Sequence, residues 1–285
     1  MLAERQFSYV ENPFGIVFDP LSMARQFSVL MSDRVFVKGD LFQHNLLWHS
    51  WLHHGRFSGE NLTATLENMN QSLVEGRHFL EKSKRWLVTF GTAHVFVLKK
   101  TGSIVANCHK APPQYFDRRR LSVEEIVEAW TPIFQKIETD NSLQLIDCQI
   151  ILTVSPIRHA RDGFIENNRS KATLLLAADK LARRFAHVTY FPAYELLMDD
   201  LRDYRFYAAD MLHPNAQAVE YIWQFFSETF FSEKTKEVVG EVEKIRAMQA
   251  HRPLHGLDTE GSRQFREQLA EQISEVERRF PFLKF

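Results

Sequence analysis

Residues 85–92, Arg85-Trp-Leu-Val-Thr-Phe-Gly-Thr92, form a short apolar run that ends in a glycine and a threonine. A run of this length that stops at a turn signal is typical of a β-strand buried in a sheet. Residues 145–154 form the most apolar run of the chain and end at Ser155-Pro156, and residues 187–191 form a third run. Longer amphipathic segments separate these runs, and the alternation predicts an α/β fold with a parallel sheet covered by helices.

The helices of this fold are predicted from the 3.6-residue period of their apolar positions. They are expected at residues 21–30, 60–84, 121–138, 168–186 and 215–230. Ser122, followed three residues later by Glu125, is the capping-box pattern of a helix start. Two short apolar runs, 95–98 and 103–106, flank Lys99-Lys-Thr-Gly102, which indicates a β-hairpin. Asn12-Pro-Phe-Gly15 indicates a turn.

The composition changes near residue 232. Beyond it, two charged amphipathic helices are expected at residues 233–250 and 259–279, with a loop from His251 to Gly256 between them. This pattern predicts two domains, an α/β domain at residues 1–232 and a C-terminal helical extension at residues 233–285. At the other end of the chain, residues 2–6 read as the end of a helix, and residues 7–10 read as extended.

Composition excludes several classes of protein. The 285 residues carry 35 Lys and Arg against 36 Asp and Glu, a net charge of -1, so the basic excess of a nucleic-acid binder is missing. Two cysteines cannot build a disulfide framework or a four-thiolate zinc site. No apolar run approaches the roughly 20 residues of a membrane span, and no secretory signal is visible. A cytoplasmic protein is expected, and the oligomeric state stays open.

The residues that suit chemistry follow the predicted strands, where ligands bind in open α/β sheets. Asp210-Met-Leu-His213-Pro214 pairs a carboxylate with an imidazole three residues away. In hydrolases, such a carboxylate holds the histidine in one tautomer while the ring relays a proton. The alternative interpretation is a solvated loop in which Pro214 begins a helix.

Asn107 and Gly91 are candidate oxyanion donors, through a side-chain amide and a backbone N–H. The alternative for Asn107 is a turn residue that binds its own backbone. Cys108 and His109 are neighbours on an extended segment, so their side chains point in opposite directions, which disfavours a thiol–imidazole pair.

The stretch Trp48-His-Ser-Trp-Leu-His53-His54 is rich in rings. His49 and His53 are four residues apart and could offer two metal ligands on a helix, but no His-Glu-x-x-His pattern supports a metal site. A helix edge whose rings close a pocket is the favoured interpretation, with His54 as a substrate contact. No metal is expected, and no nucleotide cofactor, because the chain has no phosphate-binding glycine motif.

Arg158 and Ser155 follow the most apolar predicted strand. An arginine at this position suits an anionic or carbonyl group, although a surface ion pair with Asp162 would explain it equally well. Ser155 precedes a proline and lacks a Gly-x-Ser-x-Gly elbow, so its hydroxyl is expected to satisfy a turn.

In their order along the chain, these signals resemble the SGNH (GDSL-like) hydrolases, and more narrowly the GSCFA family of that superfamily. The resemblance covers nearly all 285 residues. The matching stretches are Asn12-Pro-Phe-Gly-Ile16, Asp19-Pro-Leu-Ser22, Thr89-Phe-Gly-Thr-Ala93, Val105-Ala-Asn-Cys-His-Lys110, Thr153-Val-Ser-Pro-Ile-Arg-His159, Asn167-Asn-Arg-Ser-Lys171, Phe191-Pro-Ala-Tyr-Glu195, residues 210–215 and His251-Arg-Pro253.

The resemblance implies a flavodoxin-like three-layer α/β/α domain and a Ser-His-Asp esterase or acyl-transfer site without a cofactor. His213 would be the general base, Asp210 its orienting carboxylate, and Gly91 and Asn107 oxyanion donors. The substrate would be a small-molecule or carbohydrate ester. His54, His109, Arg158 and Ser155 would be its contacts.

The sequence departs from the family in one respect. The Gly-Ser-Cys-Phe-Ala segment that names the family, and whose serine aligns with the superfamily's nucleophile, does not occur in residues 1–285. By the resemblance it lies just upstream of Leu2, together with the first central strand, and the chain is therefore expected to be a fragment of an active hydrolase. The alternatives are a catalytically inactive ligand-binding module of the same fold and a scaffold that acts through its C-terminal helices.

Overall fold

The computed structural model describes residues 1–139, 147–251 and 260–285. Two compact units can be distinguished, one formed by residues 10–219 and the other by residues 1–9 together with 220–285. Among the described residues, no helix has both the length and the apolar composition that crossing a bilayer requires. The division at residue 232 stays a prediction about domains.

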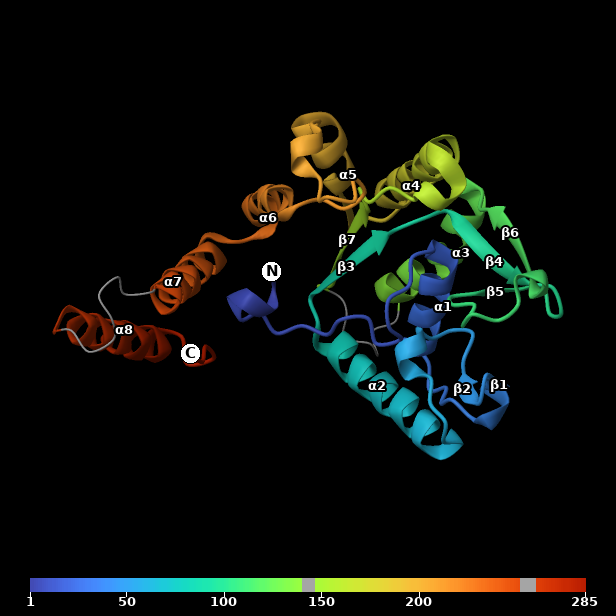
Figure 1. Ribbon diagram of the computed structural model, residues 1–285, viewed down its shortest axis with the longest axis horizontal. Coiled ribbons are helices and arrows are strands. Elements are labelled where there is room, and N and C mark those ends of the chain that lie inside the picture. Colours follow the sequence, from blue (N-terminus) through green and yellow to red (C-terminus); the bar gives the residue numbers. More distant parts are fainter. Residues whose placement is uncertain (140–146, 252–259) are drawn as a thin grey trace. The chain divides into compact units, whose positions relative to one another are not determined.

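The larger unit is built on a parallel sheet of strand order β3-β7-β8 (Figure 1). Its strands are β3 (Arg85–Phe90), β7 (Gln149–Val154) and β8 (Val188–Phe191). Phe90 lies opposite Val154, and Thr153 lies opposite Phe191, so the carboxyl ends of the three strands share one edge. The three predicted strands and the α/β class are confirmed. Residues 145 and 146 of the second predicted strand lie outside the described residues.

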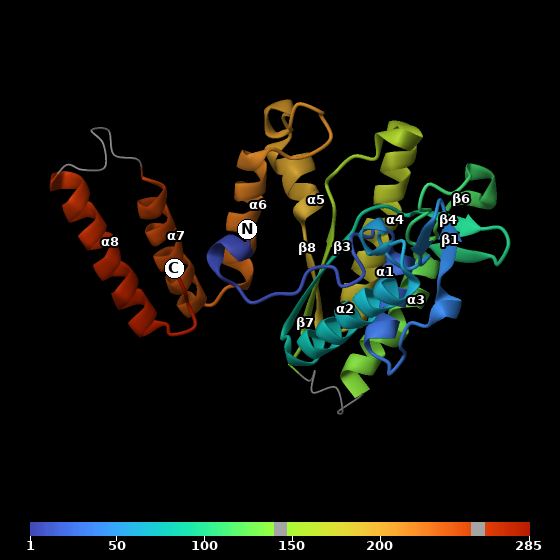
Figure 2. The same cartoon turned by 60° about the horizontal axis from the view of Figure 1, so that its bottom comes forward.

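Three helices pack side by side over the buried side of this sheet (Figure 2). They are α1 (Pro20–Leu30), α3 (Val123–Thr139) and α4 (Gly163–Arg184). Phe27 of α1 contacts the rings of Trp86 and Trp130, and Trp130 also contacts Phe90. The alternate residues of β3 that face the helices are buried while their neighbours are exposed, which is the period-2 pattern of a strand covered on one side.

The starts of the helices follow from their capping residues. Asp19 accepts the Ser22 N–H at 2.8 Å at the start of α1, and Asn61 accepts the Ala64 N–H at 2.9 Å at the start of α2 (Leu62–Lys82). At α3, Ser122 and Glu125 each accept the other's N–H, which confirms the predicted capping box.

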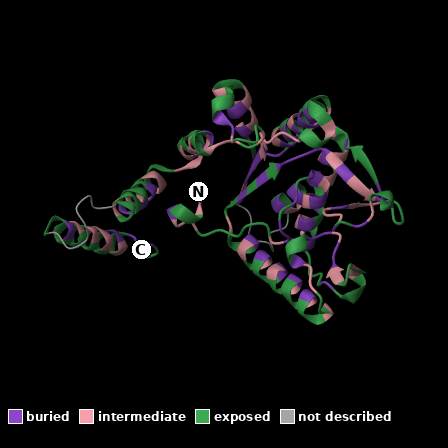
Figure 3. Ribbon diagram, viewed as in Figure 1, coloured by how far each residue is buried: buried purple, intermediate pink, exposed green. Residues whose placement is uncertain are grey.

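Figure 3 shows that α2 buries one side only.

A second sheet has the order β5-β4-β6 and is antiparallel. It consists of β4 (His94–Leu98), β5 (Ser103–Val105) and β6 (Phe116–Arg120). The hairpin of β4 and β5 is confirmed. Strand β6 was not predicted, because three successive arginines in its exposed positions carry no apolar alternation.

The predicted helix edge at residues 48–54 is wrong. Strands β1 (Phe42–His44) and β2 (Leu47–His49) form a small hairpin, and His49 ends β2 while His53 lies in a turn. Asn45 and Leu46 turn the chain with positive φ angles of 47° and 64°. The two histidines therefore do not share a helix face.

The smaller unit consists of α7 (Glu233–Ala250), α8 (Glu260–Arg279) and most of α6 (Ala216–Phe230), together with residues 1–9. The predicted helices are confirmed, whereas residues 2–6 form only the short 3-10 turn Ala3–Arg5. Arg5 binds Glu243 at 2.5 Å and stacks over Trp223, so the first residues belong to this helical unit. Residues 252–256 of the predicted loop lie outside the described residues.

Helix α4 joins the ends of β3 and β7 through the buried side chain of Lys171. Its ammonium donates to the carbonyl of Gly91 at 2.7 Å and to the carbonyl of Ser155 at 2.5 Å. Two further α4 residues act on the same edge, since Ser170 accepts the Ala93 N–H at 2.8 Å and Asn167 accepts the His159 N–H at 2.9 Å. Burial lowers the pKa of Lys171 to about 7.

We expect Lys171 to make stability depend on pH above neutrality. The pKa of Lys171 is lower in the folded chain, so between pH 7 and 10 the unfolded chain binds more protons and stability rises with pH. Lys171→Met removes this contribution. The difference in free energy of unfolding between the wild type and the variant, measured by urea unfolding, should therefore increase by about 1 kcal/mol for each pH unit between pH 7 and 10. Lys180→Met, at an exposed lysine of the same helix, should run parallel to the wild type; parallel curves for Lys171→Met would contradict the prediction.

Candidate functional site

The predicted catalytic pair lies in a loop that is closed by its own backbone. Tyr207 pairs with Pro214, and the Ala208 N–H donates to the carbonyl of His213 at 2.8 Å. Inside this loop, one carboxylate oxygen of Asp210 accepts the N–H groups of Leu212 and His213 at 2.9 and 3.0 Å. The other oxygen lies 2.6 Å from Nδ1 of the His213 ring. The structure therefore brings Asp210 and His213 into direct contact.

The electrostatics of this pair define the tautomer of the histidine. The backbone N–H of His213, the N–H of Leu212 and the His213 ring together lower the pKa of Asp210 to about 2, so the carboxylate is ionised at neutral pH. An ionised carboxylate only accepts hydrogen bonds, so Nδ1 of His213 carries the proton. The lone pair then resides on Nε2, and the side chain of His213 is 55% exposed. A histidine in this state is suited to accept a proton.

Arg158 connects the end of β7 with this loop. Its guanidinium stacks over Tyr207 at 4.4 Å and over Tyr204 at 5.5 Å from the ring centroids. The alternative of an ion pair with Asp162 is wrong, because that carboxylate binds Arg118 instead. Ser155 accepts the N–H of Ile157 at 3.2 Å, which confirms that its hydroxyl satisfies a turn.

Position 91 favours glycine because the backbone of Phe18 lies against it. The Gly91 N–H donates to the carbonyl of Phe18 at 2.9 Å, and a Cβ at Gly91 would lie 3.0 Å from that oxygen. Any larger residue would therefore displace the segment before α1. The N–H that was predicted to stabilise an oxyanion is engaged inside the protein, and its catalytic role stays a prediction.

Asn107 and His109 lie with the aromatic residues of the β1–β2 hairpin region. Asn107 Oδ1 accepts the His109 N–H at 2.8 Å, which is the turn interaction considered as its alternative. The His109 ring lies 2.8 Å from the carbonyl of Ser50 and 4.5 Å from the His49 ring centroid, and burial lowers its pKa to about 4. His54 accepts the Arg56 N–H with its own ring.

The candidate residues thus fall into two sets. Asp210, His213 and Arg158 are joined through the loop and its tyrosines, whereas Asn107 and His109 are joined to the hairpin region. Over the residues that the structure describes, no hydrogen bond, ion pair or ring contact links one set to the other. The roles of Asn107, His109 and His54 toward a substrate stay predictions.

Sequence reasoning missed the polar face of α4 and the two tyrosines under Arg158. The signal for the first is a lysine within an apolar helical period, with Asn167 and Ser170 at spacings that place all three on one face. Tyr204 begins a 3-10 helix of three residues and Tyr207 directly follows it, a segment too short for an apolar period to reveal. As for metal ions, the described part of the chain holds no group of three or more His, Cys, Asp or Glu that could ligate one.

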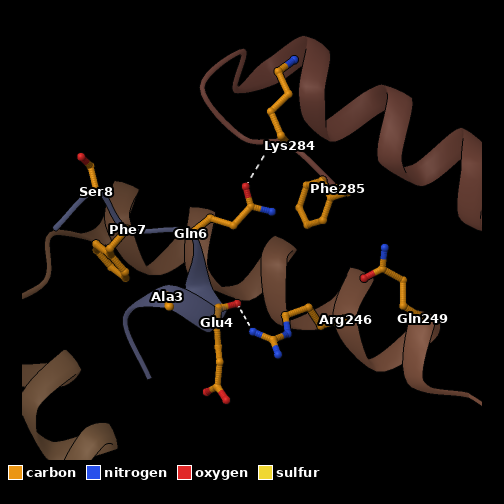
Figure 4. Close-up of a pocket in the computed structure, with 9 residues that line it drawn as sticks. All are labelled: Ala3, Glu4, Gln6, Phe7, Ser8, Arg246, Gln249, Lys284 and Phe285. Carbon is orange, nitrogen blue, oxygen red and sulfur yellow. Dashed lines mark hydrogen bonds between the residues drawn. The ribbon is translucent and has the colours of Figure 1, made fainter. Parts of the chain in front are cut away.

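A hollow in the smaller unit lies among the first and last residues of the chain (Figure 4). Its lining includes Phe7, Arg246 and Lys284, with the Arg246 side chain donating to the carbonyl of Glu4 and the Lys284 N–H donating to Gln6 at 2.7 Å. None of the predicted site residues lines it.

Comparison with known families supports the resemblance seen in the sequence. A family model described as "GSCFA family" matches residues 1–226, and another described as "GSCFA domain protein, C-terminal domain" matches residues 242–285. No curated protein and no solved structure gives a significant match to the chain.

We expect the Asp210 carboxylate to determine the tautomer of His213. In the wild type at neutral pH, nitrogen-15 NMR should show the proton on Nδ1 of His213. Asp210→Ala removes the acceptor, so a substantial fraction of the ring should change to the Nε2-protonated form. Asp203→Ala, which removes a nearby carboxylate that binds the backbone N–H and the side chain of Arg205, is the control and should leave the tautomer unchanged. An unaltered His213 spectrum in Asp210→Ala would contradict the assignment.

Proposed function

The chain belongs to the GSCFA family, and on that premise we propose that its larger unit is the acid–base part of an SGNH-type serine esterase or O-acyl transferase. The substrate class is an ester of a small molecule or a carbohydrate. The observation that carries the proposal is the 2.6 Å contact between the ionised Asp210 and Nδ1 of His213. The finer fold that we propose, a flavodoxin-like three-layer domain, is compatible with the parallel order β3-β7-β8.

In the proposed reaction, Nε2 of His213 takes the proton of a serine hydroxyl as its Oγ attacks the ester carbonyl. The tetrahedral intermediate collapses, the alcohol leaves with the proton from His213, and an acyl-serine remains. A water molecule, or a hydroxyl of an acceptor, then attacks the acyl group as His213 takes its proton. The second tetrahedral intermediate collapses by breaking the bond to the serine Oγ, which takes the proton back from His213, and the free acid or the new ester is released. Asp210 stabilises the protonated ring at each step without taking up its proton.

The serine that we assign as nucleophile is that of the Gly-Ser-Cys-Phe-Ala segment, which is not part of residues 1–285. Two serines in family-matched stretches are poor substitutes. The hydroxyl of Ser155 accepts the Ile157 N–H, and the buried hydroxyl of Ser170 accepts the Ala93 N–H. The proposed turnover therefore belongs to protein in which the family segment is present.

The proposed oxyanion donors are Gly91 and Asn107, beside the N–H of the nucleophilic serine. For Gly91 to serve, its N–H has to exchange the carbonyl of Phe18 for the substrate oxygen. That existing hydrogen bond favours a second candidate function, a non-catalytic module that binds the same ligand class. In such a module His213 contacts the ligand, so His213→Ala lowers the affinity for the ligand and there is no catalytic rate to lower.

The proposal is tested on the protein purified from its source, with its genomic copy carrying each variant. We expect hydrolysis of 4-nitrophenyl acetate and of acetylated monosaccharides. His213→Ala should lower kcat by about 10²–10⁴-fold, the usual contribution of a general base, with little change in KM. Asp210→Asn should lower kcat by a smaller factor. His78→Ala, at a histidine exposed on α2, is the control and should leave kcat unchanged.

Two results would contradict the esterase proposal. Full turnover by His213→Ala would remove His213 from the reaction. Saturable ligand binding without turnover, weakened by His213→Ala, would identify the protein as the binding module.

A further inference from the structure

Among the described residues, Arg158 has no carboxylate partner, unlike three arginines of β6 and α4, and it shares this property with the more exposed Arg161. Arg118, Arg120 and Arg169, on β6 and α4, each bind Asp162 or Glu166. For Arg158, the part of the chain that the structure describes contains no carboxylate within ion-pair distance. Instead, its guanidinium stacks on the rings of Tyr207 and Tyr204.

A guanidinium that stacks on aromatic rings and has no carboxylate partner is preorganised to bind an anion from solution. Stacking on aromatic rings fixes its plane and satisfies its faces, while its N–H donors lie at the edge of that plane. The side chain is half-buried, so some of its hydration is already lost. Burial and the nearby Asp199 carboxylate raise the pKa of the partly buried Tyr194 while Arg158 lowers it, yet Asp199 does not lie within ion-pair distance of the guanidinium. The donor edge of Arg158 therefore lacks the charged acceptor that it binds best.

The position of Arg158 relates it to the proposed base. Tyr207, on which it stacks, pairs through its backbone with Pro214, the residue directly after His213. The neighbouring Tyr204 is 63% exposed, so its ring offers a flat apolar surface to solvent beside the cation. An apolar ring next to a cation suits a sugar that carries a negative charge, because the C–H face of the sugar packs on the ring while its anionic group meets the guanidinium.

We propose that Arg158 and Tyr204 form the specificity subsite for an anionic carbohydrate ester, an acylated sugar that also carries a carboxylate or a phosphate. The proposal rests on the proposed function for the ester and for the role of His213. The anion-binding property itself depends only on Arg158 and its two tyrosines.

The test measures binding of the deacylated sugars by calorimetry, using the 285-residue chain. D-glucuronate and D-glucose 6-phosphate represent the two sources of negative charge, and D-glucose is the neutral reference. We expect at least one anionic sugar to bind about tenfold or more tightly than glucose. Arg158→Gln should abolish this preference, and Arg158→Lys should restore part of it.

Two further variants distinguish the role of the Arg158 guanidinium from that of overall charge and from that of the Tyr204 ring. Arg161→Gln makes the same change of charge three residues away, at an exposed arginine that stacks over Phe96, and should keep the preference. Tyr204→Ala, at an exposed position, should weaken all three sugars by a similar factor. Equal binding of glucose and both anions by the wild type, or an equal loss in Arg161→Gln, would overturn the proposal.

The ester assay distinguishes this inference from the proposed function. Turnover that requires His213 but is the same for neutral and anionic acetyl sugars would overturn the Arg158 subsite and leave the esterase intact. Anion binding that requires Arg158, in protein without turnover, would support the subsite and contradict the esterase.

Discussion

The ammonium of Lys171 holds the carboxyl ends of β3 and β7 together, and the arrangement around the candidate site depends on this contact. Each strand end leaves a carbonyl that the sheet does not pair, and Lys171 donates to both of them, at Gly91 and at Ser155. A buried cation without a carboxylate partner is costly, which is why its pKa falls to about 7. In return, the two hydrogen bonds of Lys171 fix the positions of the segments that follow β3 and β7.

The segments anchored in this way reach the candidate site from two directions. After β3, the N–H groups of Gly91 and Thr92 both donate to the carbonyl of Phe18, which fixes the approach to α1. After β7, the chain continues from Ser155 to Arg158, whose stack on Tyr207 links the sheet to the loop of the Asp210–His213 pair. The packing of α4, the ends of β3 and β7, and the Asp210–His213 pair are therefore parts of one connected structure.

Much of this could be predicted from the sequence where a local rule decides the outcome. The apolar period located the three parallel strands and the helices, the Ser122–Glu125 spacing located the start of α3, and the three-residue spacing brought Asp210 to His213. Prediction failed where tertiary contacts decide. Strand β6 exists because β4 pairs with it despite its arginines, and His49 lies in β2 instead of a helix because residues 45 and 46 turn the chain. Likewise, the Gly91 N–H is engaged by a carbonyl 73 positions earlier, Phe18, which no local pattern reveals.

The proposed function requires His213 to activate a serine. A fluorophosphonate labels activated serines, so we would treat the protein purified from its source with this reagent and identify the labelled peptide by mass spectrometry. We expect a single labelled serine in a Gly-Ser-Cys-Phe-Ala peptide, with labelling slowed at least about 100-fold in His213→Ala. Labelling at the same rate in His213→Ala, or no labelled serine in the wild type, would contradict the proposed function.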